Sequence, residues 1–212
     1  MTPTRIVSVT YQPLDLDLKE PFAIATGTQY QVENVLIRLE LADGTVGLGE
    51  AAPFPAVNGE TQTSTLGALV VLETHLVDQD VREWRTLAKK LDEVAHEAPS
   101  ARCGLEMAML DALCQHYNMP LYVFFGGVGI ELETDLTITA GDEAHAAASA
   151  QSIVKRGFST IKVKTEGVDV DYDFRRIQAI HSSAPGAKLI IDGNCGYAVS
   201  YTHLTLPTIL LV

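Results

Sequence analysis

Two short stretches decide the fold: residues 160–164 (TIKVK) and, one helical pattern later, residues 189–194 (LIIDGN). Residues two apart in a strand share a face, so Lys162 and Lys164 point the same way. Strands that alternate with helices predict parallel βα units buried on both faces, where ammonium groups need an anionic partner. Asp192 stands at the C-terminal end of the next strand, where βα barrels place their chemistry. The pattern predicts a site that makes and stabilises a carbanion beside a carboxylate that can hold a metal.

Each of these motifs also has an ordinary structural explanation. Lysines are common on surface edge strands, and the Asp-Gly-Asn sequence at residues 192–194 is also typical of a turn. A strand between two helical crossovers should be central and apolar, so the lysines at residues 160–164 favour a functional site. Cys195 has no evident His to activate it, and we interpret it as a bystander. The glycine cluster at residues 126–129 follows a helix, which indicates a turn between domains rather than a phosphate loop.

The surrounding pattern extends these strands into an array. Alternating residues predict a further strand at residues 133–140, and helical patterns occupy residues 142–155 and 169–181. Together with the strand at residues 188–192 this is βαβαβ with short connections. Three strands cannot close an eight-stranded barrel, so the barrel is expected to be incomplete.

The residues before the array predict a different kind of domain. Antiparallel strands are expected at residues 5–11, 32–41 and 45–50, with Asp43-Gly44 as a hairpin turn and residues 18–31 as a polar loop. Helices are expected at residues 60–75, 81–95 and 100–117, the last with Ser100 as its N-cap. The sequence therefore predicts an α+β N-terminal capping domain at residues 1–127, followed at residues 128–197 by an incomplete (β/α) TIM-type barrel.

The last residues do not continue the barrel pattern. The next element should be an amphipathic helix, but residues 199–212 lack a 3.6-residue period. Residues 199–208 resemble the translation of a common sequencing adapter, so residues 198–212 are expected to be a non-native tail on a truncated chain. The alternative is a natural apolar strand at the C-terminus.

Composition narrows the partners. The chain of 212 residues has a formal net charge of −12. A phosphate backbone requires a positive footprint, so nucleic acid is disfavoured as a partner, and so is an anionic membrane surface. Three widely spaced cysteines fit reduced thiols. No signal-peptide pattern and no membrane-spanning apolar run is present, so a cytoplasmic location is expected.

The whole of this pattern resembles the enolase superfamily, in its muconate-lactonizing-enzyme branch, and is most similar to the dipeptide epimerases. The supporting stretches are residues 21–27 (PFAIATG), 33–35 (ENV), 47–55 (GLGEAAPFP), 59–61 (GET), 103–113 (CGLEMAMLDAL), 120–121 (PL), 125–127 (FGG), the Lys-x-Lys strand and Asp192-Gly193-Asn194. The resemblance implies a cap that covers an active site at the strand C-termini of a modified βα barrel.

The resemblance also implies chemistry for the lysines and the aspartate. By position Asp192 matches the first of three carboxylate ligands of Mg²⁺, and Lys164 matches the base on one face of the substrate α-carbon. Lys162 matches the lysine that assists it and contacts the substrate. Removing a proton α to a carboxylate creates an enediolate, and cations stabilise that charge where it develops. A neighbouring ammonium group favours the neutral form of a lysine that acts as base.

Further positions follow from the same resemblance. Thr137 matches a substrate-contacting residue on the first barrel strand, and Thr26 and Gly27 match the specificity loop of the cap. Gly27 stands where one type of epimerase has an arginine for a glutamyl side chain, so acidic dipeptides are not predicted. Asn194 is expected to support Asp192. The other two acidic ligands and the opposing lysine would lie on later strands.

The predicted function is that of an isomerase: an Mg²⁺-dependent epimerase or racemase acting on a dipeptide or N-acyl amino acid, in a homo-oligomeric parent enzyme. Lys-x-Lys serves the whole superfamily, so muconate cycloisomerase and o-succinylbenzoate synthase activities remain open. A third alternative is a non-catalytic folded fragment, and this chain by itself is expected to be inactive.

Overall fold

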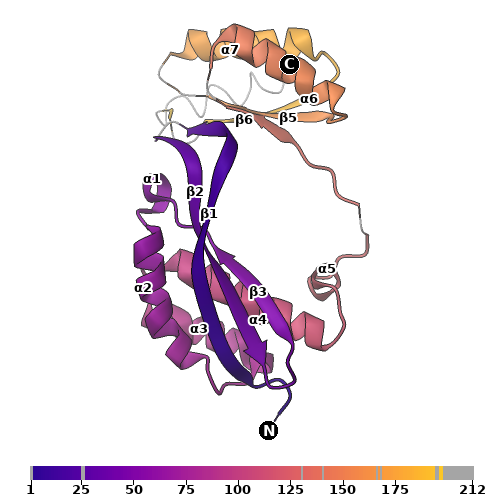
Figure 1. Ribbon diagram of the computed structural model, residues 1–212. Coiled ribbons are helices and arrows are strands. Elements are labelled where there is room, and N and C mark those ends of the chain that lie inside the picture. Colours follow the sequence, from indigo (N-terminus) through magenta and orange to yellow (C-terminus); the bar gives the residue numbers. More distant parts are fainter. Residues whose placement is uncertain are drawn as a thin grey trace. The chain divides into compact units, whose positions relative to one another are not determined.

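A computed structural model describes residues 2–24, 27–129, 131–139, 141–165, 167, 169–193 and 196–197. The chain divides into two compact units, each continuous in space but not in sequence (Figure 1). The first unit contains residues 1–19 and 30–130, and the second contains residues 20–29 and 131–212. The expected boundaries after residues 127 and 197 stay predictions, and the expected tail at residues 198–212 lies outside the described residues.

The first unit is built on a sheet with the strand order β1-β2-β3. Its strands are β1 (Ile6–Ile24), β2 (Gly27–Leu41) and β3 (Val46–Ala51). Strands β2 and β3 are antiparallel, and Val35 pairs with Ala51. Gly44, in the predicted turn between them, has a φ of +87°, a conformation that glycine adopts without steric cost.

The predicted polar loop at residues 18–31 is wrong, because β1 continues to Ile24 and β2 already begins at Gly27. The loop was predicted from a polar stretch that contains Pro21 and Gly27, and proline cannot donate a hydrogen bond to a ladder. Strand β1 lies at the edge of its sheet, and an edge strand tolerates a proline on its open side.

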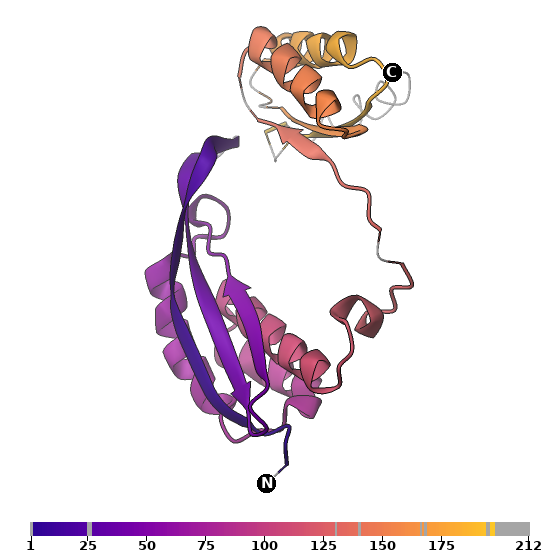
Figure 2. The same ribbon diagram turned by 45° about the vertical axis from the view of Figure 1, so that its right-hand side comes forward.

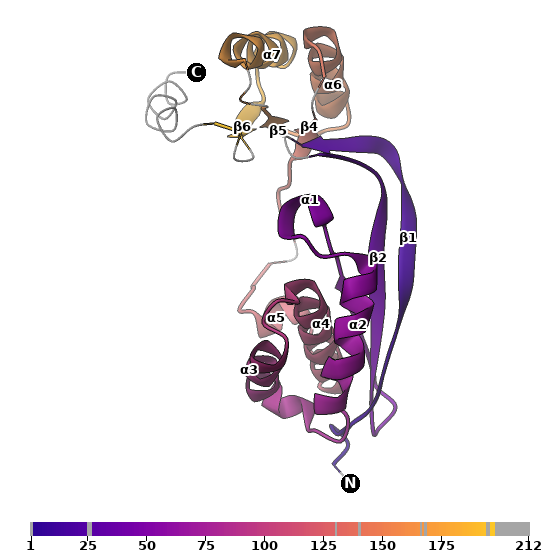
Figure 3. The ribbon, with the colours of Figure 1, turned by 90° about the vertical axis from the view of Figure 1, so that its left-hand side faces the viewer.

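Helices cover one face of this sheet (Figure 3). The α-helices are α1 (Pro55–Asn58), α2 (Gln62–Leu72), α3 (Trp84–Val94), α4 (Pro99–His116) and α5 (Leu121–Phe124), with short 3₁₀ turns at η1 (Glu73–His75) and η2 (Val81–Glu83). Helix α4 begins one residue earlier than predicted, with Ala98 rather than Ser100 at the N-cap. Pro99 at the first helical position fits, because its missing N–H is not needed there.

Helix α4 packs on β3 at unusually close range. A Cβ atom added to Gly47 or Gly49 of β3 would overlap the backbone of α4 at Ala108 and Gly104 respectively. The two glycines alternate with Leu48, so both face the helix. Buried side chains of α4, including Leu105 and Met109, complete the apolar core of this unit.

The second unit contains a parallel sheet with the strand order β4-β5-β6. Its elements are β4 (Leu136–Ile138), α6 (Glu143–Lys155), β5 (Thr160–Lys164), α7 (Val170–Ser183) and β6 (Lys188–Asp192). Helices α6 and α7 cover one face of the sheet (Figure 1), and Ile161 and Val163 of β5 pack toward the apolar core that includes Ile180. These five elements form the predicted βαβαβ array. The α+β first unit, followed by an incomplete barrel, confirms the expected fold class.

The chain between α5 and β4 has neither helix nor strand over its described residues (Figure 2). Within the described part of the chain, no helix is both long enough and apolar enough to cross a lipid bilayer.

Candidate active site

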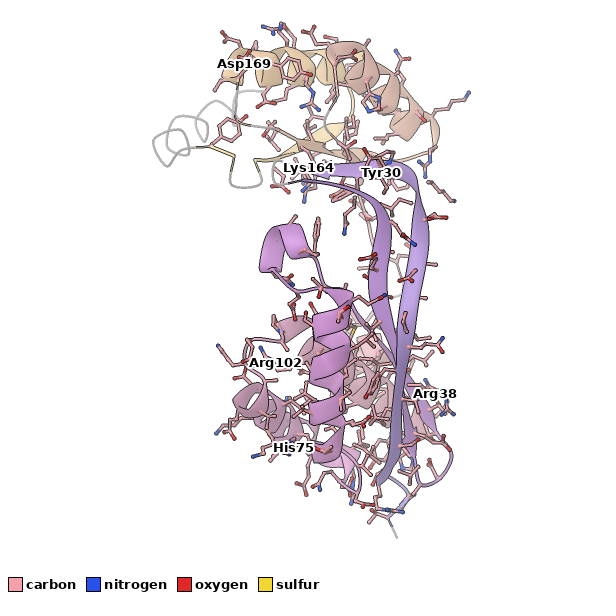
Figure 4. The ribbon with its side chains drawn as sticks, turned by 60° about the vertical axis from the view of Figure 1, so that its left-hand side comes forward. Tyr30, Arg38, His75, Arg102, Lys164 and Asp169 are labelled. Carbon is pink, nitrogen blue, oxygen red and sulfur yellow. The ribbon has the colours of Figure 1, made fainter. Side chains whose placement is uncertain are left out.

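Two lysines of β5 meet one carboxylate of β6. The Nζ atom of Lys162 lies 2.9 Å from Oδ2 of Asp192, and the Nζ atom of Lys164 lies 2.8 Å from the same oxygen. The parallel register pairs Lys164 with Asp192, so neighbouring side chains at the strand ends point to the same face. Because Ile161 and Val163 occupy the helix-covered face, the lysines take the other one; Lys164 is labelled in Figure 4.

The three charged groups differ in exposure. The side chain of Lys164 is 11% exposed, whereas that of Lys162 is 33% exposed. The pKa of Lys162 is raised above the ordinary value for lysine, first by its hydrogen bond to Asp192 and then by the charge of that carboxylate. In this arrangement Asp192 therefore holds Lys162 in its charged form, and the one carboxylate compensates two ammonium groups.

Thr137 lies on the same side of the sheet. It pairs with Lys162 in the register between β4 and β5, which brings the predicted substrate-contacting residue beside the predicted assisting lysine. Thr26 and Asn194 lie outside the described residues, and of Gly27 only the backbone, which begins β2, is described. The structure thus places four of the predicted site residues side by side, and the roles of all seven stay predictions.

An aromatic ring that the sequence did not single out approaches the same lysine. Phe22, near the end of β1, belongs to the second unit, and its ring centre lies 6.0 Å from Nζ of Lys164. Such a ring attracts an ammonium group through its negative face. Its only sequence signal was its place in the stretch 21–27, where it was read as part of a loop.

A second missed group lies beneath the strand ends. Arg176 and Asp173 of α7 are both buried, and Oδ2 of Asp173 accepts a hydrogen bond of 2.6 Å from the hydroxyl of Tyr197. Burial, and next the bond to Asp173, raises the pKa of Tyr197 to about 12. The available signal was a pair of opposite charges spaced i, i+3 on the helix face that also carries Ile180, where apolar residues are expected.

A divalent cation would find one suitable ligand in this set. The carboxylate of Asp192 is the hard oxygen donor that Mg²⁺ prefers, and it lies at a strand end beside Lys162 and Lys164. Among the described residues, no group of three or more His, Cys, Asp or Glu side chains could hold a metal ion. The donor chemistry fits one Mg²⁺ ligand, and any further ligands lie elsewhere.

Comparison with known proteins gives this geometry a context. The family model described as "Mandelate racemase / muconate lactonizing enzyme, N-terminal domain" matches residues 6–126. An aromatic dipeptide epimerase from Herpetosiphon aurantiacus is 64% identical over 197 residues, which are 93% of this chain and 55% of that protein. The chain therefore spans about half the length of the curated relative.

Solved structures of proteins with related descriptions have a similar fold. The crystal structure of a mandelate racemase/muconate lactonizing protein from Herpetosiphon aurantiacus superimposes with a TM-score of 0.93 at 59% identity, over 99% of this chain and 60% of that one. A dipeptide epimerase from Cytophaga hutchinsonii, in complex with Mg and the dipeptide D-Ala-L-Val, gives a TM-score of 0.90 at 31% identity, over 97% of this chain and 56% of that one.

Proposed function

Because the chain belongs to the mandelate racemase / muconate lactonizing enzyme family, we propose that it is part of a dipeptide epimerase, an isomerase that inverts the carbon α to a carboxylate. The observation that carries this proposal is the joint contact of Lys162 and Lys164 with Asp192 at neighbouring strand ends. The similarity to a relative named aromatic dipeptide epimerase supports a dipeptide, and an aromatic one first, as the substrate.

The two lysines are proposed to have different roles, which follow from their different exposure and contacts. Lys164, the more buried of the two, takes the α proton at its Nζ atom from one face of the substrate. Lys162, held charged by Asp192, stabilises the negative charge that develops on the substrate carboxylate. Phe22 keeps one side of Lys164 dry, which strengthens these electrostatic interactions.

Asp192 is the residue of this chain that would hold Mg²⁺. When bound, the cation supplies Lewis-acid stabilisation of the substrate carboxylate as the proton leaves. The Nζ atom of Lys164, 2.8 Å from Oδ2 of Asp192, is the group of this chain that would accept the proton beside that cation.

Thr137 and the stretch around Thr26 and Gly27 are proposed to contact the substrate. Thr137 lies beside Lys162 in the sheet register, so its hydroxyl can bond to a polar group of the bound dipeptide. Gly27 offers no cation for an acidic side chain, which agrees with an aromatic rather than a glutamyl substrate. Asn194 is proposed to support Asp192 from the loop that follows it.

The activity is proposed for a longer protein that carries this sequence and has the relatives' length, here called the full-length form. The described residues supply one carboxylate of the expected three, and a base on one face only. The 212-residue chain by itself is therefore proposed to be inactive. Epimerisation by the purified chain, free of any full-length form, would contradict this.

The test is a panel of dipeptides incubated with the full-length form in D₂O and followed by proton NMR. We expect loss of the α-proton signal together with inversion, dependence on Mg²⁺, and the best rates for dipeptides with an aromatic residue. Muconate and the precursor of o-succinylbenzoate belong in the same panel. Turnover of either one without dipeptide epimerisation would replace the proposal with a cycloisomerase or a synthase.

A further inference from the structure

The guanidinium of Arg176 joins the ends of two neighbouring strands. The side chain has no exposed surface. Its Nη1 atom donates a hydrogen bond of 3.0 Å to the carbonyl oxygen of Lys164, and Nη2 donates one of 2.8 Å to that of Thr139. Thr139 directly follows β4, and Lys164 is the last residue of β5. One side chain of α7 thus holds both strand ends from below the candidate site.

A second set of contacts fixes the guanidinium itself. Oδ1 of Asp173 lies 3.4 Å from Nη1, and Oδ2 of Asp173 accepts bonds from the backbone N–H of Gly167 at 3.0 Å and from Tyr197. A buried cation needs a partner of opposite charge, which Asp173 provides from one turn earlier. The loops after β5 and β6 are tied to the same aspartate, so the cluster connects three strand ends.

The geometry requires arginine rather than any cation. A guanidinium is a rigid planar fork whose donors diverge, whereas a lysine ammonium is a point charge on a flexible stem. The Nε atom of Arg176 is buried and has no hydrogen-bond partner within the described part of the chain. The Nη1 and Nη2 atoms of Arg176 both reach carbonyl oxygens. We therefore infer that these two carbonyls, and not contact with water, determine the position of the guanidinium.

We propose that Arg176 is a positioning residue that fixes the backbone of Lys164, so that its Nζ atom is held where the α proton is removed. This inference rests on the proposed function, in which Lys164 is the base. Catalytic groups must be held within about 0.5 Å of the productive geometry, and the 3.0 Å bond from Arg176 fixes the backbone carbonyl of Lys164, the same residue that carries the proposed base.

The test compares Arg176→Lys and Arg176→Met with Arg175→Met in the full-length form. Arg175 is the neighbour on the same helix, half exposed and paired with Glu143 on the surface, so its loss controls for charge and helix propensity. Exchange of the α proton is measured separately for each epimer of the substrate, as kcat and KM.

A positioning role affects one face of the substrate. We expect Arg176→Lys to lower kcat for exchange from the epimer whose proton faces Lys164 by on the order of 10²-fold. KM and exchange from the other epimer should stay unchanged, and Arg175→Met should exchange both epimers as the wild type does. Equal losses for both epimers, no loss, or failure of both Arg176 variants to fold would each overturn the inference and leave Arg176 with a structural role or none.

A crystal structure of the metal-free Arg176→Lys variant separates this inference from the proposed function. Positioning predicts that Nζ of Lys164 leaves its place 2.8 Å from Oδ2 of Asp192, whatever the enzyme's substrate proves to be. If the wild type exchanges no α proton but Lys164 still moves in the variant, the proposed function fails and the control of Lys164 by Arg176 stands. An unmoved Lys164 overturns the inference even in an active enzyme.

Discussion

Lys164 and Asp192 face each other across two parallel strands and form a hydrogen bond of 2.8 Å. The register makes them direct neighbours, so the contact needs no long side chain to bend toward a distant partner. A proposed base and a proposed metal ligand therefore share one hydrogen bond. Their proposed roles differ, and they can be tested separately: proton exchange reports on Lys164 and Mg²⁺ affinity reports on Asp192.

Replacement of Lys164 by Ala in the full-length form should abolish α-proton exchange from one epimer of the dipeptide and spare the other. The reason is that Lys164 reaches only one face of the α-carbon, and a base placed on the other face is not affected. Exchange from D₂O, followed by NMR for each epimer, measures it. Lys155→Ala, an exposed lysine of α6, is the matched control; undiminished exchange from both epimers in Lys164→Ala would remove the residue from the mechanism.

Asp192→Asn should weaken Mg²⁺ binding to the full-length form by more than about tenfold. Loss of a group that merely supports a ligand already costs 10- to 100-fold in affinity, and an amide carries no charge to hold the cation. Calorimetric titration with Mg²⁺ measures the change. Asp171→Asn, in the first turn of α7, should bind as the wild type does, and an unchanged affinity in Asp192→Asn would exclude Asp192 as a ligand.

Tyr197 gives a prediction at alkaline pH. Its pKa in the folded protein is about 12, against about 10 in an unfolded chain. Below the lower value both states are protonated and the contribution of Tyr197 to stability is complete. As the pH rises from the lower value to the higher one, only the unfolded state loses its proton, so stability falls over this window. Urea unfolding across the window measures this, and Tyr197→Phe should flatten the fall; the same slope in both proteins would contradict the assigned burial.

The close packing of β3 on α4 predicts that Gly49→Ala destabilises the first unit. The new methyl group overlaps the backbone of Gly104 and Ala108, and overpacking of this kind costs about 1–3 kcal/mol. Gly67→Ala, on the exposed side of α2 with open space around it, should instead stabilise by about 1 kcal/mol, because alanine favours the helix. The midpoints of urea unfolding compare the two, and a stable Gly49→Ala would mean that α4 can move away from the sheet.

The sequence predicted the parts of the fold that depend on local pattern. Strand β5 was predicted from the alternation of residues 160–164 and β6 from an apolar segment one helical pattern later, and the contact of their charged residues followed from parallel pairing at one sheet edge. The loop expected at residues 18–31 was wrong because the tolerance of β1 for Pro21 depends on its edge position, which no local pattern reveals.

The interior charges were missed for a related reason. Arg176 lies on the apolar face of α7, and a charge on such a face can be recognised as buried only when its acceptors are known. Those acceptors are the backbone carbonyls of Thr139, directly after β4, and of Lys164 at the end of β5, and the amino-acid sequence does not reveal them. The close packing of Gly47 and Gly49 on α4 could not be predicted either. These glycines matter because they have no Cβ atom, and this becomes apparent only when the position of the helix is known.

The division of the chain has a consequence for recombination between homologues. Residues 20–29 belong to the second unit, with the βα elements, although in sequence they lie between the two segments of the first unit. A chimera made by a single crossover near residue 130 would inherit Lys164 from one parent and Phe22 from the other, although the ring and the ammonium group are neighbours. Exchange of activity between two parents would thus require a double crossover that carries residues 20–29 along with the barrel strands.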